Sequence, residues 1–404
     1  MTMRPGAQFS STRIPGIDSL RGLCILAVIL LHINLRIPFE KNFIGARFSH
    51  STLSAIFRSG HYGVIVFFVI SGFLITSVSL KRWGGLQNIK PVEFYEIRFA
   101  RIAPCLVGLL VVLSFLHLGG VQGFVISQPR ISLWRAIWSA ITFHLNWLEA
   151  KFGYLPGGWD VLWSLSVEEA FYFGFPLVCR WIRSSAALFS IMAGFVIVGP
   201  FARTVFTKNP MWADHSYLSC MDGIALGFFA ACIKNKFEFR RKTQLAFAIA
   251  GSAAMFAVVF FKGAVAGLGL YRTGLDVTVL EIAAACFILG VQTKTSGGAR
   301  LSPLRWLGKN SYEVYLTHMF VVTFLVRGFY AMRSSVNMAP AWYVVILCLS
   351  GLSGDLVAWC YSEPLNRRIR GKFFPPAAAR AAMPGIKIQV ETSDAPVEES
   401  QKVL

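Results

Sequence analysis

Long apolar stretches separated by short charged loops set the pattern of this 404-residue chain. A helix needs about 20 predominantly apolar residues to cross a bilayer, and stretches of about this length recur from one end to the other. We expect ten spanning helices, at residues 20–36, 62–80, 102–118, 164–182, 186–202, 217–233, 243–261, 273–292, 311–331 and 340–361. The predicted fold is an all-α polytopic membrane protein.

One further apolar stretch, Ser132–Leu148, is interrupted by an arginine, a histidine and an asparagine. Counting it as a span would move the basic runs Lys234–Lys242 and Lys294–Lys309 to the outer side of the membrane. Short cytoplasmic loops carry an excess of Lys and Arg, so we predict that this stretch does not span. Both termini are then cytoplasmic, and most of the 39 Lys and Arg residues lie on the cytoplasmic side.

Composition agrees with a protein that lies in a bilayer. The chain is 55% hydrophobic and only 15% charged, with a mean hydropathy of +0.57, which excludes an ordinary soluble domain. We expect a cytoplasmic N-terminal segment at residues 1–16, a membrane domain at 17–370 and a disordered cytoplasmic tail at 371–404. The first segment lacks the apolar core of a cleavable signal peptide.

The net charge of +19 indicates which kinds of partner the protein binds. Because the basic residues decorate short cytoplasmic loops, they indicate contact with anionic membrane lipid or a phosphorylated donor, and not with nucleic acid. The eight cysteines are scattered through apolar segments without metal-ligand spacing. We therefore predict neither a disulfide framework nor a metal site.

An arginine and a histidine lie eleven positions apart on the first apolar helix. Eleven residues at 100° each come to about 20° past three turns, so Arg21 and His32 share one face, roughly 16 Å apart along the axis. Ionisable residues inside a membrane are costly and point to function. The alternatives are that Arg21 only reaches the cytoplasmic headgroups and that His32 is a core histidine.

Two segments that follow the first span indicate helix packing and anion binding. In Gly63–Ile75, small residues favour close helix packing, which would place the second span against the first, beside His32. In the following cytoplasmic loop, Arg98 and Arg101 are three residues apart and project side by side on a helix. Two guanidinium groups so arranged form a phosphate clamp, or alternatively a positive-inside anchor.

Polar and aromatic residues also gather where the fourth span begins on the outer side. Glu168 and Glu169 lie near the start of this helix with Trp163 and Tyr172. One acid fits the positive end of a helix, with a serine as cap, and two acids are more than a cap needs. Such a carboxylate can orient an imidazole or bind a sugar hydroxyl, with the aromatic rings stacking on the sugar.

The ninth predicted span carries a polar face of its own. Ser311, Tyr315 and His318 follow i, i+4, i+7 spacing, so they lie on one side of the helix. For His318, an interhelical hydrogen bond and a role in substrate binding are both open.

Six blocks in order make the chain resemble the integral-membrane acyltransferase family 3, whose members modify bacterial polysaccharides, nodulation factors and macrolides. They are IDSLRGLCILAVILLH, GVIVFFVISGFLI, FYEIRFARIAP, WSLSVEEAFYF, LGKNSYEVYLTH and YSEP, and the resemblance covers nearly all of residues 14–370. It implies a ten-span helical domain that transfers an acyl group, usually acetyl from acetyl-coenzyme A, to a hydroxyl. The coenzyme is a donor substrate, and no permanently bound cofactor is expected.

The resemblance also implies roles for particular residues. The family's Arg and His fall on Arg21 and His32, its Arg-x-x-Arg on Arg98 and Arg101, and its acidic position on Glu168. The chain departs from the family at Cys220, where many members have an arginine two residues before the position of Asp222. This departure puts the usual acceptor class in doubt. Partners would be a glycan or lipid-linked sugar and the polysaccharide-synthesis machinery, at the inner membrane of a bacterium.

We therefore expect Arg98 and Arg101 to hold the donor phosphates while His32 takes the proton of the acceptor hydroxyl. Glu168 would orient the imidazole, and Glu169, Trp163, Tyr172, Tyr315 and His318 would contact the acceptor. A relay through an acyl-histidine stays open, as do a macrolide acceptor and a scaffold role. A secondary transporter of an anionic solute is the rival class, although the two halves show no corresponding broken spans.

Overall fold

The computed structural model describes residues 14–206, 208–292 and 302–373, and within these ranges the regular structure is entirely helical. The long helices are α1 (Pro15–Asn34), α3 (Gly60–Trp83), α4 (Pro91–Leu118), α8 (Leu162–Trp181), α9 (Ser185–Thr204), α11 (Tyr217–Lys236), α12 (Arg241–Phe260), α15 (Leu275–Gly290), α17 (Ser311–Ala331) and α18 (Ala339–Val357). The shorter helices are α2 (His50–Phe57), α5 (Leu133–Ile141), α6 (Leu145–Phe152), α7 (Gly157–Asp160), α10 (Pro210–His215), α13 (Lys262–Gly267), α14 (Leu270–Thr273), α16 (Ser302–Lys309) and α19 (Glu363–Phe373). Single turns are η1 (Phe39–Lys41), η2 (Gly45–Arg47), η3 (Leu86–Asn88) and η5 (Val336–Met338), and a π-helical stretch, η6 (Ala358–Ser362), joins α18 to α19.

The predicted class, a helical polytopic membrane protein, is confirmed. Each of the ten predicted spans overlaps a long helix, and eight helical segments of the described chain are long and apolar enough to cross a membrane. The other two predicted spans correspond to α8, which carries Glu168 and Glu169, and to α15, which has 16 residues. The count of ten and the cytoplasmic termini stay predictions.

The apolar stretch Ser132–Leu148 forms two short helices. α5 has 9 residues and α6 has 8, and the chain turns between them at Phe143, whose φ is 57°. Neither helix approaches the length needed to span, which agrees with the prediction. At the C-terminal end, α19 runs to Phe373, past the predicted boundary at residue 370. The rest of the predicted tail, residues 374–404, lies outside the described residues, as does most of the predicted segment 1–16.

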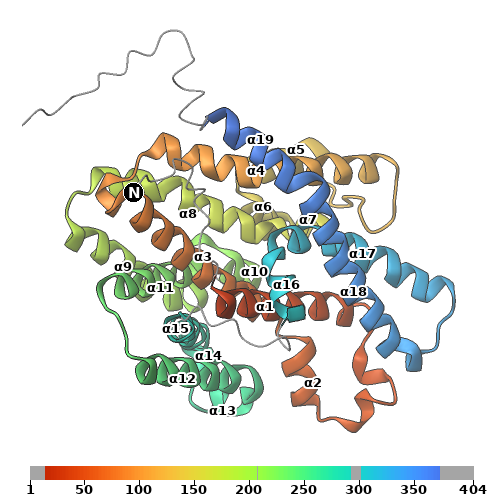
Figure 1. The fold of residues 1–404 in the computed structure, drawn as a ribbon. Coiled ribbons are helices and arrows are strands. Elements are labelled where there is room, and N and C mark those ends of the chain that lie inside the picture. The colour runs from red at the N-terminus through yellow and green to blue at the C-terminus, as the bar shows by residue number, and fades with distance from the viewer. Residues whose placement is uncertain (1–13, 207, 293–301, 374–404) are drawn as a thin grey trace, which may run out of the picture.

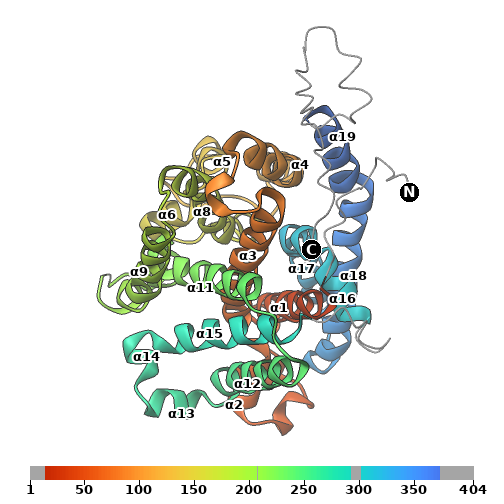
Figure 2. The same ribbon diagram turned by 60° about the vertical axis from the view of Figure 1, so that its left-hand side comes forward.

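Helix α1 lies inside the bundle, with α3, α16, α17 and α18 packed around it (Figures 1 and 2). A Cβ atom on Gly63 would lie 2.8 Å from the carbonyl oxygen of Cys24, so the predicted contact of the second span with the first is confirmed. On another side of α1, Gly22 and Gly308 let the backbones of α1 and α16 touch. This central position surrounds Arg21 and His32 with side chains from other helices.

Helix α3 makes its other close contact with α11. A Cβ on Gly72 would lie 2.0 Å from the carbonyl oxygen of Ile224, and one on Gly227 would lie 2.1 Å from that of Val69. Small residues at such crossings allow backbones to approach, as is usual between membrane helices. Helix α8 lies against α3, α4 and α11, so its carboxylates enter the same interior as α1.

Candidate active site

The polar faces of α1 and α17 meet. At one end, Arg21 Nε donates to Ser311 Oγ at 3.1 Å, and Arg21 Nη1 lies 4.0 Å from Asp18 Oδ1. At the other end, the rings of His32 and His318 lie 5.2 Å apart between centroids. The two faces predicted separately from helical spacing therefore form one line of polar groups through the bundle.

The two histidines differ in how they are held. His318 is fully buried, and its Nδ1 lies 2.7 Å from the carbonyl oxygen of Tyr315. A carbonyl oxygen only accepts, so Nδ1 donates and the lone pair of the neutral ring lies on Nε2. His32 is half-buried, and its ring makes no hydrogen bond to any described residue, while its backbone carbonyl accepts from Arg36 Nη1 at 2.8 Å. The His32 imidazole is therefore free to bind a substrate proton.

The carboxylate of Glu168 does not contact the His32 ring, contrary to the predicted orienting role. Its Oε1 accepts a hydrogen bond from Ser71 Oγ of α3 at 2.8 Å, and the ring beside His32 is that of His318. Helical spacing defines which face of α8 carries Glu168, but not which neighbouring helix that face meets. Ser71 was interpreted only as a small packing residue in the sequence.

Glu169 pairs with one of the two predicted clamp arginines. Arg98 Nη2 lies 3.2 Å from Glu169 Oε1, and the guanidinium stacks on Tyr172 with Cζ 3.7 Å from the ring centroid. Arg101, one turn further along α4, is exposed. The two guanidinium groups thus lie in different surroundings, and Arg98 is the one held in a defined position beside the polar line.

Trp163 and Tyr172 are largely covered by other side chains. Trp163 is 6% exposed and stacks on His215 at 3.8 Å between centroids, while Tyr172 is 4% exposed and stacks on Arg98. One face of each ring is therefore covered by a protein side chain, and only the other face is left for the predicted stacking on a sugar. Tyr315 is held by hydrogen bonds of its hydroxyl to Ser164 Oγ at 2.8 Å and to the carbonyl oxygen of Val161 at 3.1 Å.

An acidic pair on the short helices α6 and α7 was not predicted from the sequence. Glu149 of α6 is fully buried and accepts a hydrogen bond from Leu155 N at 3.0 Å. Burial and the nearby carboxyl group of Asp160 raise the pKa of Glu149 well above its ordinary value. Burial also raises the pKa of Asp160 to about 7, although interaction with Glu149 and the Arg36 cation lowers it. The carboxyl group of Asp160 therefore titrates with a pKa of about 7, next to a glutamate whose pKa is raised as well.

No group of three or more His, Cys, Asp or Glu side chains in the described part of the chain is arranged to hold a metal ion. The ionisable groups along the α1–α17 line are Asp18, Arg21 and the imidazoles of His32 and His318. A base without a hydrogen bond, on the same helix face as a positioned cation, suits proton transfer from a hydroxyl and binding of an anionic substrate.

Comparison with known proteins identifies the family. The family model described as an acyltransferase domain, acyltransferase 3, matches residues 14–359. The chain belongs to the acyltransferase 3 family. It is similar to the peptidoglycan O-acetyltransferase OatA of Listeria monocytogenes, with 27% identity over 343 residues that cover 80% of this chain and 51% of that protein. It is also similar to the O-acetyltransferase OatA of Staphylococcus aureus, with 25% identity over 388 residues that cover 89% and 58% of the two chains.

The chain spans about half the length of these acyltransferase 3 relatives. A putative O-acetyltransferase of Staphylococcus aureus is similar over 77% of this chain, with 26% identity. No solved structure matches the chain.

The departure from the acyltransferase 3 pattern at Cys220 has a structural counterpart. Asp222 of α11 is paired with Arg203 of α9, whose Nη2 lies 2.7 Å from Asp222 Oδ2. The same guanidinium group donates to three further oxygens, the carbonyls of Ser219 and Gly274 and the hydroxyl of Thr278. An arginine from another helix therefore accompanies the aspartate in this chain, which residue spacing along α11 could not reveal.

Proposed function

We propose that this acyltransferase transfers an acetyl group from acetyl-coenzyme A to a hydroxyl of a cell-surface or lipid-linked carbohydrate, at the inner membrane of a bacterium. His32 removes the proton of the acceptor hydroxyl as the hydroxyl oxygen attacks the thioester carbonyl. The carbon–sulfur bond then breaks, and the imidazolium returns the proton to the thiolate of coenzyme A. The observation that carries this proposal is the His32 ring, half-buried and without a hydrogen bond to any described residue, on the face shared with Arg21.

The arrangement of cations supports a phosphorylated donor. Arg21 is held by Ser311, and Arg98 is held by Glu169 and Tyr172, so both guanidinium groups are positioned before any substrate arrives. Positioned cations cost less reorganisation on binding an anion. Arg101 is exposed one turn from Arg98, where it can meet a phosphate group from the cytoplasm. We assign these arginines to the donor.

The acceptor assignment rests on the relatives. The names of the similar proteins include a peptidoglycan O-acetyltransferase, and peptidoglycan is a carbohydrate polymer with free hydroxyls. In this chain the ring of His318 lies beside that of His32, and the ring of Tyr315 lies beside that of His318. Because the lone pair of His318 lies on Nε2, we propose that His318 accepts a hydrogen bond from the acceptor hydroxyl or from His32 itself.

The proposed function can be tested in cells that express variants of the protein. We would measure ester-linked acetate on surface carbohydrate in cells that express the wild type, His32→Ala or His50→Ala, at matched membrane levels. His50 is an exposed histidine at the start of α2, so its variant removes an imidazole that has no place in the proposed chemistry. We expect acetate with the wild type and His50→Ala and its loss with His32→Ala. Equal acetate with His32→Ala would contradict the role of His32, and wild-type cells that resemble the empty vector would contradict the carbohydrate acceptor.

A further inference from the structure

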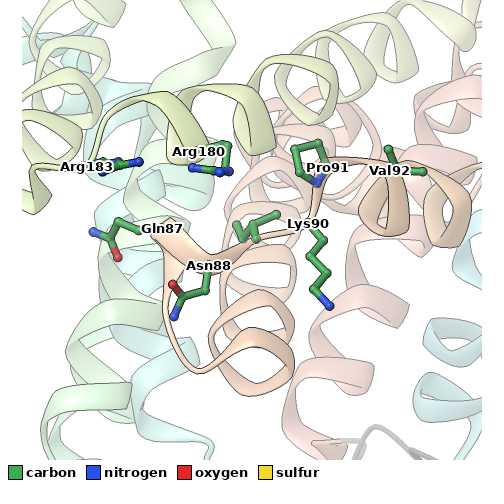
Figure 3. Close-up of a pocket in the computed structure, with 8 residues that line it drawn as sticks. Gln87, Asn88, Lys90, Pro91, Val92, Arg180 and Arg183 are labelled. Atoms are coloured by element: carbon green, nitrogen blue, oxygen red, sulfur yellow. The ribbon is translucent and has the colours of Figure 1, made fainter. Parts of the chain in front are cut away.

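A cavity lies where α4 begins and α8 ends, at the cytoplasmic ends of these helices as we have oriented them. Its volume is about 630 Å³, within the range of roughly 300–1,000 Å³ that is usual for small-molecule sites. One wall is the segment Gln87–Val92, which joins η3 to the first turn of α4. The other wall is Arg180 near the end of α8 and Arg183 just after it (Figure 3).

The lining of this cavity is cationic. Three of its eight residues are Lys90, Arg180 and Arg183, and none of the eight is acidic. In Figure 3 Arg180 and Arg183 lie on one side of the segment Gln87–Val92, and the Lys90 side chain extends away from them. The 28-residue helix α4 begins at Pro91 in the wall, so the positive end of its dipole adds to the field. Two guanidinium groups and a helix start favour an anion such as a phosphate over a neutral ligand.

The cavity and the ion pair of Arg98 with Glu169 lie along the same two helices, α4 and α8. Pro91 and Arg98 are seven residues apart on α4, which is about 20° short of two turns and about 10 Å along the axis. Glu169 and Arg180 are eleven residues apart on α8, about 20° past three turns and about 16 Å along the axis. The cavity therefore lies on the same two helix faces as the ion pair between Arg98 and Glu169.

A second contact holds this interface together between the cavity and the ion pair. Tyr95 OH donates to the carbonyl oxygen of Phe173 at 2.6 Å. The two helices are thus held together between the cavity and the ion pair, which fixes the position of Arg98 relative to Arg180.

We propose that this cavity binds the 3′-phosphorylated adenosine end of the donor, with Arg180 and Arg183 on the phosphate. This assignment rests on the proposed function, in which acetyl-coenzyme A is the donor. The adenosine and its 3′-phosphate then stay at the aqueous cytoplasmic surface, while the diphosphate lies toward Arg98 and Arg101 and the uncharged pantetheine arm carries the thioester into the membrane. Burying the 3′-phosphate would be costly, which favours a surface site for it.

Binding of coenzyme A and of 3′-dephospho-coenzyme A tests this proposal without requiring turnover. The purified protein would be placed in lipid nanodiscs, and Kd would be measured for both ligands with the wild type and the double variant Arg180→Gln/Arg183→Gln. The matched control is Arg240→Gln/Arg241→Gln, which removes two exposed arginines at the start of α12. We expect the wild type and the control to prefer coenzyme A by about tenfold or more, and the cavity variant to bind both ligands equally.

Each other result overturns the proposal in a distinguishable way. If the cavity variant keeps the wild-type preference, or the wild type has none, the 3′-phosphate binds elsewhere. If the variant weakens both ligands equally, and only in nanodiscs that contain anionic lipid, the cavity holds a lipid headgroup. If the wild type binds neither ligand, the donor assignment fails together with this site. If it binds coenzyme A with the expected preference but transfers no acetyl group, only the proposed function fails.

Discussion

Replacing Arg203 with glutamine removes a buried cation that joins α9 to α11 and α15. Arg203 pairs with Asp222 at 2.7 Å and donates to three further oxygens, at Ser219, Gly274 and Thr278. Interhelical hydrogen bonds in membranes average about 0.6 and reach about 1.7 kcal/mol each, so four contacts correspond to about 2–7 kcal/mol. Removing one partner of a buried ion pair costs about 3–5 kcal/mol. We expect Arg203→Gln to lower the free energy of unfolding by about 3–5 kcal/mol.

The assay is a denaturant titration of the purified protein in mixed micelles, followed by tryptophan fluorescence. The control is Arg183→Gln, because the Arg183 side chain is exposed and its removal should change the free energy of unfolding by no more than about 0.5 kcal/mol. A loss below about 1 kcal/mol for Arg203→Gln, equal to the control within error, would refute the view that this network holds the three helices together.

Two further predictions concern titration and packing. The pKa of Asp160 is about 7 in the folded protein against an ordinary value of 3.8, so the folded state binds the extra proton and stability should fall as pH rises through this window. Melting temperatures from pH 4 to 8 should show a shallower fall for Asp160→Asn than for the wild type or the exposed control Asp214→Asn, and equal slopes would contradict this. Gly72→Ala places a methyl group against the Ile224 carbonyl oxygen and should lower the melting temperature of detergent-solubilised protein. Gly194→Ala meets open space and should leave it unchanged or raise it slightly, so equal effects would argue against the close helix crossing.

The helices and their polar faces could be predicted from sequence because both depend on local spacing. The apolar stretches correspond to long helices, and the faces of Arg21 with His32 and of Ser311 with His318 meet in the structure. The interrupted stretch Ser132–Leu148 forms two short helices, which agrees with the prediction from charge distribution that it does not span. Helical periodicity predicts which residues share a face, and polar residues within an apolar helix indicate that this face is buried or functional.

Which faces meet could not be predicted. Glu168 is bonded to Ser71 and not to His32, because the neighbour of α8 at that depth is α3. Arg203 supplies the cation beside Asp222 from a different helix, and nothing in the spacing of either residue links them. Such pairs depend on how helices far apart in sequence are arranged, and a single sequence contains no direct record of that arrangement.

The measurement that tests the account most directly is release of coenzyme A from acetyl-coenzyme A by purified protein in nanodiscs, with a polysaccharide hydroxyl acceptor present. General-base catalysis contributes about 10²–10⁴-fold to rate, so His32→Ala should release coenzyme A at least about 100-fold more slowly than the wild type. His50→Ala should match the wild type, and both variants should be compared at equal binding of coenzyme A. A His32→Ala protein that releases coenzyme A at the wild-type rate would contradict the central claim that this imidazole takes the acceptor proton.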